Sequence, residues 1–302
     1  MPNSVASALD FRHRRKVVLG EFEFPTMGHI WLAQRPRGAE IVFVNSVGNQ
    51  IPLSHYDQAV DRNTLLVPLT RICFMNGFRS NVQAVVRIAH ERGALVMLDD
   101  YQDCGTRPVD VKALDVDFFV TGTLKYLLGP PGLAFLYVKK ELIESLVPTA
   151  SGWFAQKNPF AFDPKLFDPS PTARKFESGT PPIPNIYAGA GGLDVLQTIG
   201  LENIALQVSK LAMALREGAL SLGLRMKTPA DSVGPLVVSE ARNAEALVQK
   251  LAESGIVVSS RHDGLRISFH VYNTLDDVRA VLDVLDRNRN LLVNDKIAAS
   301  HD

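Results

Sequence analysis

Six short apolar runs, rich in β-branched and aromatic residues, constrain the fold more than any other feature of the sequence. They occupy residues 16–21, 40–45, 64–69, 94–99, 116–121 and 133–138, and each is almost continuously hydrophobic. A strand with one face in water alternates polar and apolar side chains, whereas a strand covered on both faces does not. The pattern therefore predicts an α/β fold built on a large, mostly parallel sheet.

A helix is predicted between the third and fourth of these runs. Residues 80–93 carry apolar side chains at helical spacing, so that one stripe of the helix is hydrophobic. Ser80 and Gln83 have the spacing of a capping box, and Gly93 stands where a helix commonly ends. A helix in this place connects two neighbouring strands, as a crossover in a parallel sheet requires.

The second half of the chain has a different pattern. Residues 139–184 are rich in aromatic residues and proline, which predicts an ordered loop that packs on another surface. Residues 186–222 predict two successive helices, and shorter strands and helices follow. We expect a large domain over residues 1–200 and a smaller C-terminal α+β domain over residues 201–302, which includes the connecting helix.

Composition narrows the classes of partner. The 302 residues contain 32 basic and 32 acidic side chains, so the overall charge favours neither nucleic acid nor an anionic membrane. The two cysteines, Cys73 and Cys104, match no metal-binding spacing and provide no disulfide framework. No run is long and apolar enough for a signal peptide or a membrane span, so we expect a cytoplasmic protein without a metal site.

Polar residues follow the ends of two predicted strands. Asp99 ends the run 94–99, Gln102 comes three residues later, and Lys125 follows the run 116–121. The carboxyl ends of strands are where α/β sheets bind ligands. A carboxylate there can pair with a protonated ring nitrogen, an amide can hydrogen-bond a ring hydroxyl, and a desolvated lysine supplies the neutral amine that forms a Schiff base.

A fourth candidate lies near the C-terminus. In "LRISFHV", alternation places Arg266, Ser268 and His270 on one face of a strand. A guanidinium beside a cleft can bind a carboxylate through two parallel hydrogen bonds.

Each of these signals has a simpler explanation when taken alone. Arg266 fits a solvated strand face, Asp99 fits an acidic turn, and Lys125 fits a structural lysine whose stem is buried. Taken together, a carboxylate, an amide and then a lysine at strand ends match what a pyridoxal-phosphate site requires.

Three longer stretches carry a family resemblance. "LDDYQDCGTRPVDV" with "VDFFVTGTLKYLLGPPGLAFLYV", then "FESGTPPIPNIYAGAGGLDVL", then "LRISFHVYNTLDDV" resemble the class V aminotransferases, which are fold-type I pyridoxal-phosphate enzymes. The sequence is most similar to the isopenicillin-N-epimerase-like and cysteine-desulfurase-like group. The resemblance implies an aspartate-aminotransferase-like fold, pyridoxal 5'-phosphate as cofactor, an amino acid as substrate and a homodimer.

The resemblance also implies roles for single residues. Lys125 would form the Schiff base with the cofactor, Asp99 would hold the pyridine nitrogen, and Gln102 would face the ring hydroxyl. Phe24 would stack on the ring.

Two further implied roles concern the substrate and the second subunit. Thr180 would contact the cofactor phosphate of the neighbouring subunit, and Arg266 would bind the substrate α-carboxylate.

The sequence departs from the family pattern at several positions. Leu124 stands where relatives often have His, and Gly122 stands where they tend to have a phosphate-binding Ser. Thr121 and Thr123 flank that glycine and either can supply the hydroxyl, Thr123 being the one included in the predicted site. Relatives also carry a further N-terminal segment that binds the cofactor phosphate.

The function expected from this resemblance is amino-group transfer from an amino acid. Epimerization or elimination would use the same first steps, so a family epimerase or lyase is an alternative. Cysteine desulfurization is not expected, because the stretch "VVSSRHDGLRIS" lacks the cysteine nucleophile. A further alternative is an inactive family member that acts as a binding or scaffold protein.

Overall fold

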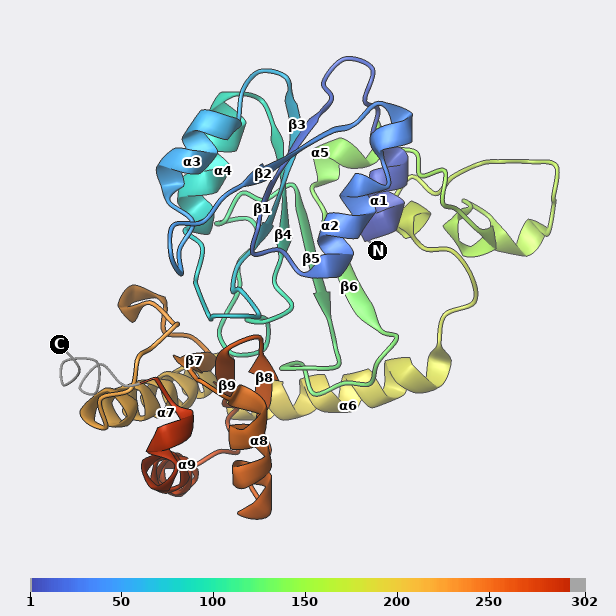
Figure 1. The fold of residues 1–302 in the computed structure, drawn as a ribbon. Coiled ribbons are helices and arrows are strands. Elements are labelled where there is room, and N and C mark those ends of the chain that lie inside the picture. The colour runs from blue at the N-terminus through green and yellow to red at the C-terminus, as the bar shows by residue number, and fades with distance from the viewer. Residues whose placement is uncertain (1, 294–302) are drawn as a thin grey trace.

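The computed structural model describes residues 2–293 and contains two sheets (Figure 1). The large sheet consists of β1 (Lys16–Gly20), β2 (Glu40–Val44), β3 (Thr64–Thr70), β4 (Leu95–Asp99), β5 (Phe118–Gly122) and β6 (Ala134–Val138), in the order β2-β1-β3-β4-β5-β6. The first five are parallel and β6 is antiparallel. The predicted α/β fold with a large, mostly parallel sheet is confirmed.

Helices cover both faces of this sheet, which explains the continuous hydrophobicity of its strands. On one face α3 (Leu53–Ala59) and α4 (Val82–Glu91) pack on side chains such as Val67 and Leu98. On the other face α1 (Pro2–Ala8), α2 (Pro25–Leu32) and α5 (Lys140–Ile143) pack on side chains such as Leu66 and Met97. Each such buried aliphatic side chain contributes roughly 1.5–3 kcal/mol through removal from water.

The start of α4 differs from the sequence prediction. The cap is Asn81, whose Oδ1 accepts a hydrogen bond from the backbone N–H of Ala84 at 3.1 Å. Ser80 instead donates its hydroxyl to the Thr70 carbonyl at 2.8 Å. The predicted capping box at Ser80 is therefore wrong, because the Ser80 hydroxyl connects the loop to the end of β3 instead of capping the helix. Gly93 does follow the helix, with φ of 71°.

The C-terminal part is built on the small antiparallel sheet. Its elements are α6 (Ile183–Ile199), α7 (Leu201–Ser221), β7 (Leu236–Glu240), α8 (Ala244–Glu253), β8 (Ser259–Arg261), β9 (Gly264–Ser268) and α9 (Leu275–Arg287), with strand order β7-β9-β8. Gly200, with φ of 87°, separates α6 from α7 where the predicted domain boundary falls. The division stays a prediction, and residues 294–302 of the second domain lie outside the described residues.

The segment between β6 and α6 extends away from the body of the protein (Figure 1). It contains only short helical turns beyond α5, and its aromatic rings pack largely on one another, as Trp153 does on Phe154 and Phe162. Phe160 and Phe162 remain 66% and 70% exposed, so much of this segment is not packed on the sheet.

None of the helices within residues 2–293 combines the length and apolar character needed to cross a bilayer.

Candidate active site

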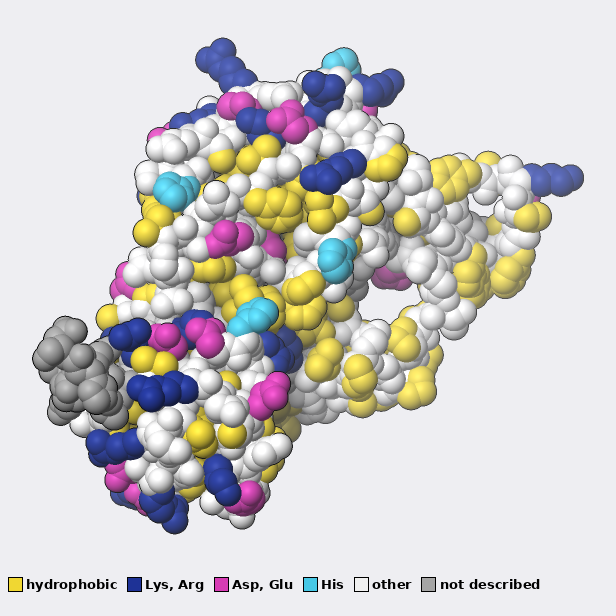
Figure 2. Space-filling model, viewed as in Figure 1, with side chains coloured by type: hydrophobic (Ala, Val, Ile, Leu, Met, Phe, Trp, Pro, Cys, Tyr) yellow, Lys and Arg dark blue, Asp and Glu magenta, His cyan; other side chains and the backbone are white. Residues whose placement is uncertain are grey.

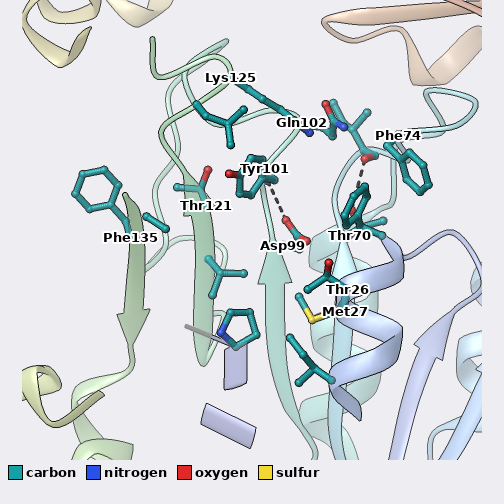
Figure 3. A pocket seen from close by; sticks show the side chains of 17 residues that line it. Thr26, Met27, Thr70, Phe74, Asp99, Tyr101, Gln102, Thr121, Lys125 and Phe135 are labelled. Atoms are coloured by element: carbon teal, nitrogen blue, oxygen red, sulfur yellow. Dashed lines mark hydrogen bonds between the residues drawn. The ribbon is translucent and has the colours of Figure 1, made fainter. Parts of the chain in front are cut away.

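A cavity of about 370 Å³ opens at the carboxyl ends of the central strands (Figure 3). Because β3, β4 and β5 run parallel, the residues that end them meet at one edge of the sheet. Four of the predicted site residues line this cavity, and they are Phe24, Asp99, Gln102 and Lys125. The cavity therefore brings together side chains that are up to 101 positions apart in the sequence (125 − 24 = 101).

Asp99 is the acidic group of the cavity. Its Oδ1 accepts a hydrogen bond from the backbone N–H of Tyr101 at 3.0 Å, which fixes the carboxylate at the end of β4. Burial raises the pKa of Asp99, while this hydrogen bond and the charge of Lys125 lower it. Gln102 is buried three residues later and lines the same cavity.

Lys125 supplies the amine. Burial, together with the positive charges of Arg266 and Arg261, lowers the pKa of Lys125 to about 8, although the charge of Asp99 acts in the opposite direction. Within the described chain no carboxylate forms a salt bridge with its ammonium group; Nζ lies 4.8 Å from the centroid of the Tyr101 ring. At neutral pH this amine loses its proton more readily than an ordinary lysine.

A tight turn holds Lys125 in this position. The Leu128 N–H donates to the Lys125 carbonyl at 3.0 Å, and the Gly129 N–H donates to the Thr123 carbonyl at 2.8 Å. A side chain at Gly129 would place its Cβ 2.6 Å from Cβ of Thr123, so the turn requires glycine there. This packing explains the glycine in the otherwise apolar stretch after the lysine.

The two threonines near the lysine have different environments. Thr123 is fully buried and donates its hydroxyl to the Pro130 carbonyl at 2.6 Å, outside the cavity lining. Thr121 lines the cavity, and its buried hydroxyl lies near the Cys104 thiol without a hydrogen bond of good geometry among residues 2–293. Thr123 does not line the cavity and its hydroxyl already has a partner, whereas Thr121 does line it; which of the two contacts a phosphate stays a prediction.

Phe24 lines the cavity, whereas Arg266 does not line it but contacts the lining residue Phe74. Phe24 precedes α2, is 45% exposed, and meets Phe74 edge to face with ring centroids 5.0 Å apart. Arg266, on β9, donates from Nη1 to the Phe74 carbonyl at 3.1 Å, which brings the small sheet against the large one. Thr180 is exposed in the segment before α6 and does not line the cavity of its own chain.

Tyr101 is a cavity residue that the sequence reasoning missed. Its ring lies between Lys125 and β5, directly over Gly122, where an added Cβ would come within 2.0 Å of the tyrosine hydroxyl. Gly122 therefore leaves the space that this ring occupies. The sequence carried a signal for this contact, because a glycine next to an apolar strand often marks a place where another part of the chain approaches closely.

Gly122→Ala is expected to destabilise the protein by about 1–3 kcal/mol, because the new methyl group overlaps the Tyr101 side chain. Chemical denaturation measures this loss. In a Tyr101→Ala background the same change should cost much less, since the overlapping ring is gone. Gly28→Ala is the control, because nothing lies within 4 Å of a Cβ at that position. Equal losses in both backgrounds would contradict the overlap.

Glu23 is a second residue that the sequence reasoning missed. It is buried below the cavity, where Oε1 accepts a hydrogen bond from the Thr70 N–H at 2.7 Å and Oε2 has no partner in residues 2–293. Burial and the nearby charge of Asp99 raise the pKa of Glu23 to about 8, although the hydrogen bond from the Thr70 N–H acts in the opposite direction. Glu23 therefore holds its proton more tightly than an ordinary carboxyl group, and its own negative charge beside Asp99 is disfavoured.

Known proteins are similar to this chain both in sequence and in fold. The sequence is 31% identical over 281 residues to an uncharacterized aminotransferase, YcbU, of Bacillus subtilis strain 168, covering 93% of this chain and 74% of that protein. It is 30% identical over 243 residues to a kynureninase of Pseudomonas fluorescens, covering 76% of this chain and 58% of the enzyme. The apo structure of a cysteine desulfurase from Thermococcus onnurineus NA1 matches with a TM-score of 0.84 and 26% identity, covering 94% of this chain and 76% of that one.

The family model described as aminotransferase class-V matches residues 1–281, which is most of the chain. That range contains the cavity with Asp99, Gln102 and Lys125, and β9 with Arg266. The chain therefore belongs to the class V aminotransferase family, and its cofactor is pyridoxal 5'-phosphate.

Proposed function

We propose that this protein is an enzyme that transfers the amino group of an amino acid, with Lys125 as the residue that bonds the cofactor and carries the proton. The observation that supports this proposal most is that Lys125, Asp99 and Gln102 all line one cavity. Other folds place a lysine or a carboxylate in a cleft, but this set matches the different groups around one pyridoxal ring.

The residues present fit the cofactor. Asp99 would hold the ring nitrogen, Gln102 the ring hydroxyl, Phe24 one ring face, and Thr121, which lines the cavity, a phosphate oxygen. When bound, pyridoxal phosphate supplies an electron sink that weakens the bonds at the α-carbon of an amino acid.

The protein's own residues would do the remaining work. The Lys125 amine would remove the proton from the substrate α-carbon and hold it for return at a different atom during amino-group transfer. A pKa near 8 suits a base that works at neutral pH. Arg266 orients the substrate by binding its α-carboxylate. Phe24, Leu124 and Phe135 form an apolar rim around the opening, which limits access of water.

Cysteine desulfurases and a kynureninase are among the relatives, so a lyase reaction is the second candidate. A persulfide mechanism lacks support because neither cysteine lines the cavity. Burial raises the pKa of Cys73 to about 11 and that of Cys104 to about 12, so neither thiol ionises at neutral pH.

The proposed enzyme works as a homodimer. Exposed apolar side chains gather along α6 (Figure 2), among them Ile183, Ile186, Tyr187 and Val195. Such a patch favours contact with another protein surface. Thr180 lies three residues before α6 begins, so contact between two copies through this patch would bring the threonine close to the partner subunit.

A labelled amino acid distinguishes the candidate reactions. The purified protein is loaded with pyridoxal phosphate and incubated with ¹⁵N-labelled amino acids and an unlabelled 2-oxo acid. Amino-group transfer predicts label in the new amino acid made from the oxo acid. Label released as ammonium, or racemised substrate with no transfer, would contradict the proposal and indicate a lyase or an epimerase. No conversion of any substrate would favour an inactive binding protein.

Attachment of the cofactor is expected to depend on pH with a midpoint near 8. Only the neutral Lys125 amine reacts with the aldehyde, and burial lowers the pKa of Lys125 from the ordinary 10.5 to about 8. The rate of borohydride-trapped attachment should therefore rise with pH and level off above about 8. A rate that keeps rising towards pH 10.5 would show that the amine is not desolvated.

The same shift has a consequence for stability. The unfolded chain binds the lysine proton up to about pH 10.5 and the folded chain only up to about 8. The contribution of Lys125 to stability therefore increases as pH rises through this window.

A further inference from the structure

Two arginines lie side by side on the small sheet. In the β8–β9 pair, Ser259 is opposite Arg266 and Arg261 is opposite Gly264. Directly opposite residues of an antiparallel pair point to the same face, and alternate residues of one strand share a face. Arg261 and Arg266 are therefore diagonal neighbours on one face, and the hydrogen bond from Arg266 Nε to Ser259 Oγ at 3.0 Å confirms this orientation.

This face looks towards the active site. Arg266 Nη1 donates to the carbonyl of Phe74, and the Phe74 ring lines the cavity. Val238, opposite Arg266 on β7, packs with Ile72, another cavity residue. The positive charges of both arginines help to lower the pKa of Lys125, the residue that is proposed to carry the proton.

Neither arginine has a carboxylate partner within residues 2–293. Arg266 donates to a serine hydroxyl and a backbone carbonyl, and Arg261 Nη1 donates to the Ser260 carbonyl at 2.6 Å. Some other cations of intermediate burial are neutralised by a carboxylate, since Lys227 pairs with Asp263, and Arg107 pairs with Asp103 at 3.0 Å. Two adjacent guanidinium groups are thus left with uncompensated charge.

A single α-carboxylate can neutralise only one of these groups. Diagonal neighbours on a strand pair lie about 7–8 Å apart, and two long side chains can converge from that distance on the two carboxylates of one small molecule. Guanidinium groups bind carboxylates through paired hydrogen bonds, so each can hold one of them.

We propose that the substrate is an amino acid with a second carboxylate, of the aspartate or glutamate type, in which Arg266 binds the α-carboxylate and Arg261 binds the side-chain carboxylate. This assignment rests on the proposed function for the position of the substrate. It adds Arg261 as the residue that selects the acidic side chain.

Calorimetric titration of the loaded protein with L-aspartate and L-glutamate, and with their neutral amides L-asparagine and L-glutamine, tests the proposal. The acidic amino acids are expected to bind about tenfold or more tightly than the amides, as a charged hydrogen-bonded pair allows. Arg261→Gln should remove this preference by weakening only the acidic ligands, and Arg261→Lys should restore part of it. Arg266→Gln should weaken all four ligands, and Arg62→Gln, on an exposed arginine, should change none.

Equal affinity for acids and amides in the unchanged protein, or an equal loss for both in Arg261→Gln, would overturn the assignment. Titration of the cofactor-free protein with succinate and with its monoamide separates this result from the proposed function. A preference for succinate that depends on Arg261 supports the arginine pair even if no cofactor attaches, and the absence of any preference counts against it even in an active enzyme.

Discussion

Lys125→Met is expected to lower the rate of amino-group transfer by at least about a thousandfold, because the change removes both the covalent anchor and the proton carrier. The methionine side chain fills similar space, and Lys125 makes no salt bridge in the described residues, so the fold should be retained. The rate is measured on protein loaded with pyridoxal phosphate, and circular dichroism checks the fold.

A lysine elsewhere provides the matched control. Lys140, the first residue of α5, is exposed and remote from the cavity lining, so Lys140→Met should leave the rate unchanged. If Lys125→Met retained near-normal transfer while folded, the amine would not be the proton carrier.

Asp99→Asn is expected to reduce the rate by about 10²–10³-fold, a loss typical of removing one electrostatic group aimed at developing charge. Asparagine has nearly the same shape and can still accept the hydrogen bond from the Tyr101 N–H. The change therefore removes the charge that would keep the ring nitrogen protonated. Steady-state kinetics with the best substrate found in the labelling experiment measure the loss.

Asp163→Asn makes the same chemical change on an exposed residue of the projecting segment and should have no effect. A cofactor analogue with a permanently positive ring nitrogen should recover part of the rate in Asp99→Asn, because it no longer needs the carboxylate. Failure of that recovery, with the cofactor bound, would argue that Asp99 acts mainly on structure.

Much of the architecture could be predicted from the sequence, because buried parallel strands leave a clear hydrophobic signature. Once the strands were placed, Asp99 and Lys125 had to lie at one edge of the sheet, since parallel strands end together. The two successive helices and the short strands and helices that follow them were also predicted, and they are present as α6 to α9 with β7 to β9.

Details set by contacts between distant residues could not be predicted. Whether Thr121 or Thr123 faces the cavity depends on the turn that buries the Thr123 hydroxyl against Pro130. The place of Tyr101 depends on the missing side chain at Gly122, which is 21 positions away (122 − 101 = 21). The charge state of Glu23 depends on its burial beside Asp99, and no local pattern encodes that.

The most direct test of the central claim is the identity of the residue that bonds the cofactor. Borohydride reduction of the loaded protein, followed by peptide mapping with mass spectrometry, locates the attached group. We expect one modified peptide, carrying the reduced cofactor on Lys125. Attachment at another lysine, or unmodified Lys125 in protein that contains the cofactor, would contradict it.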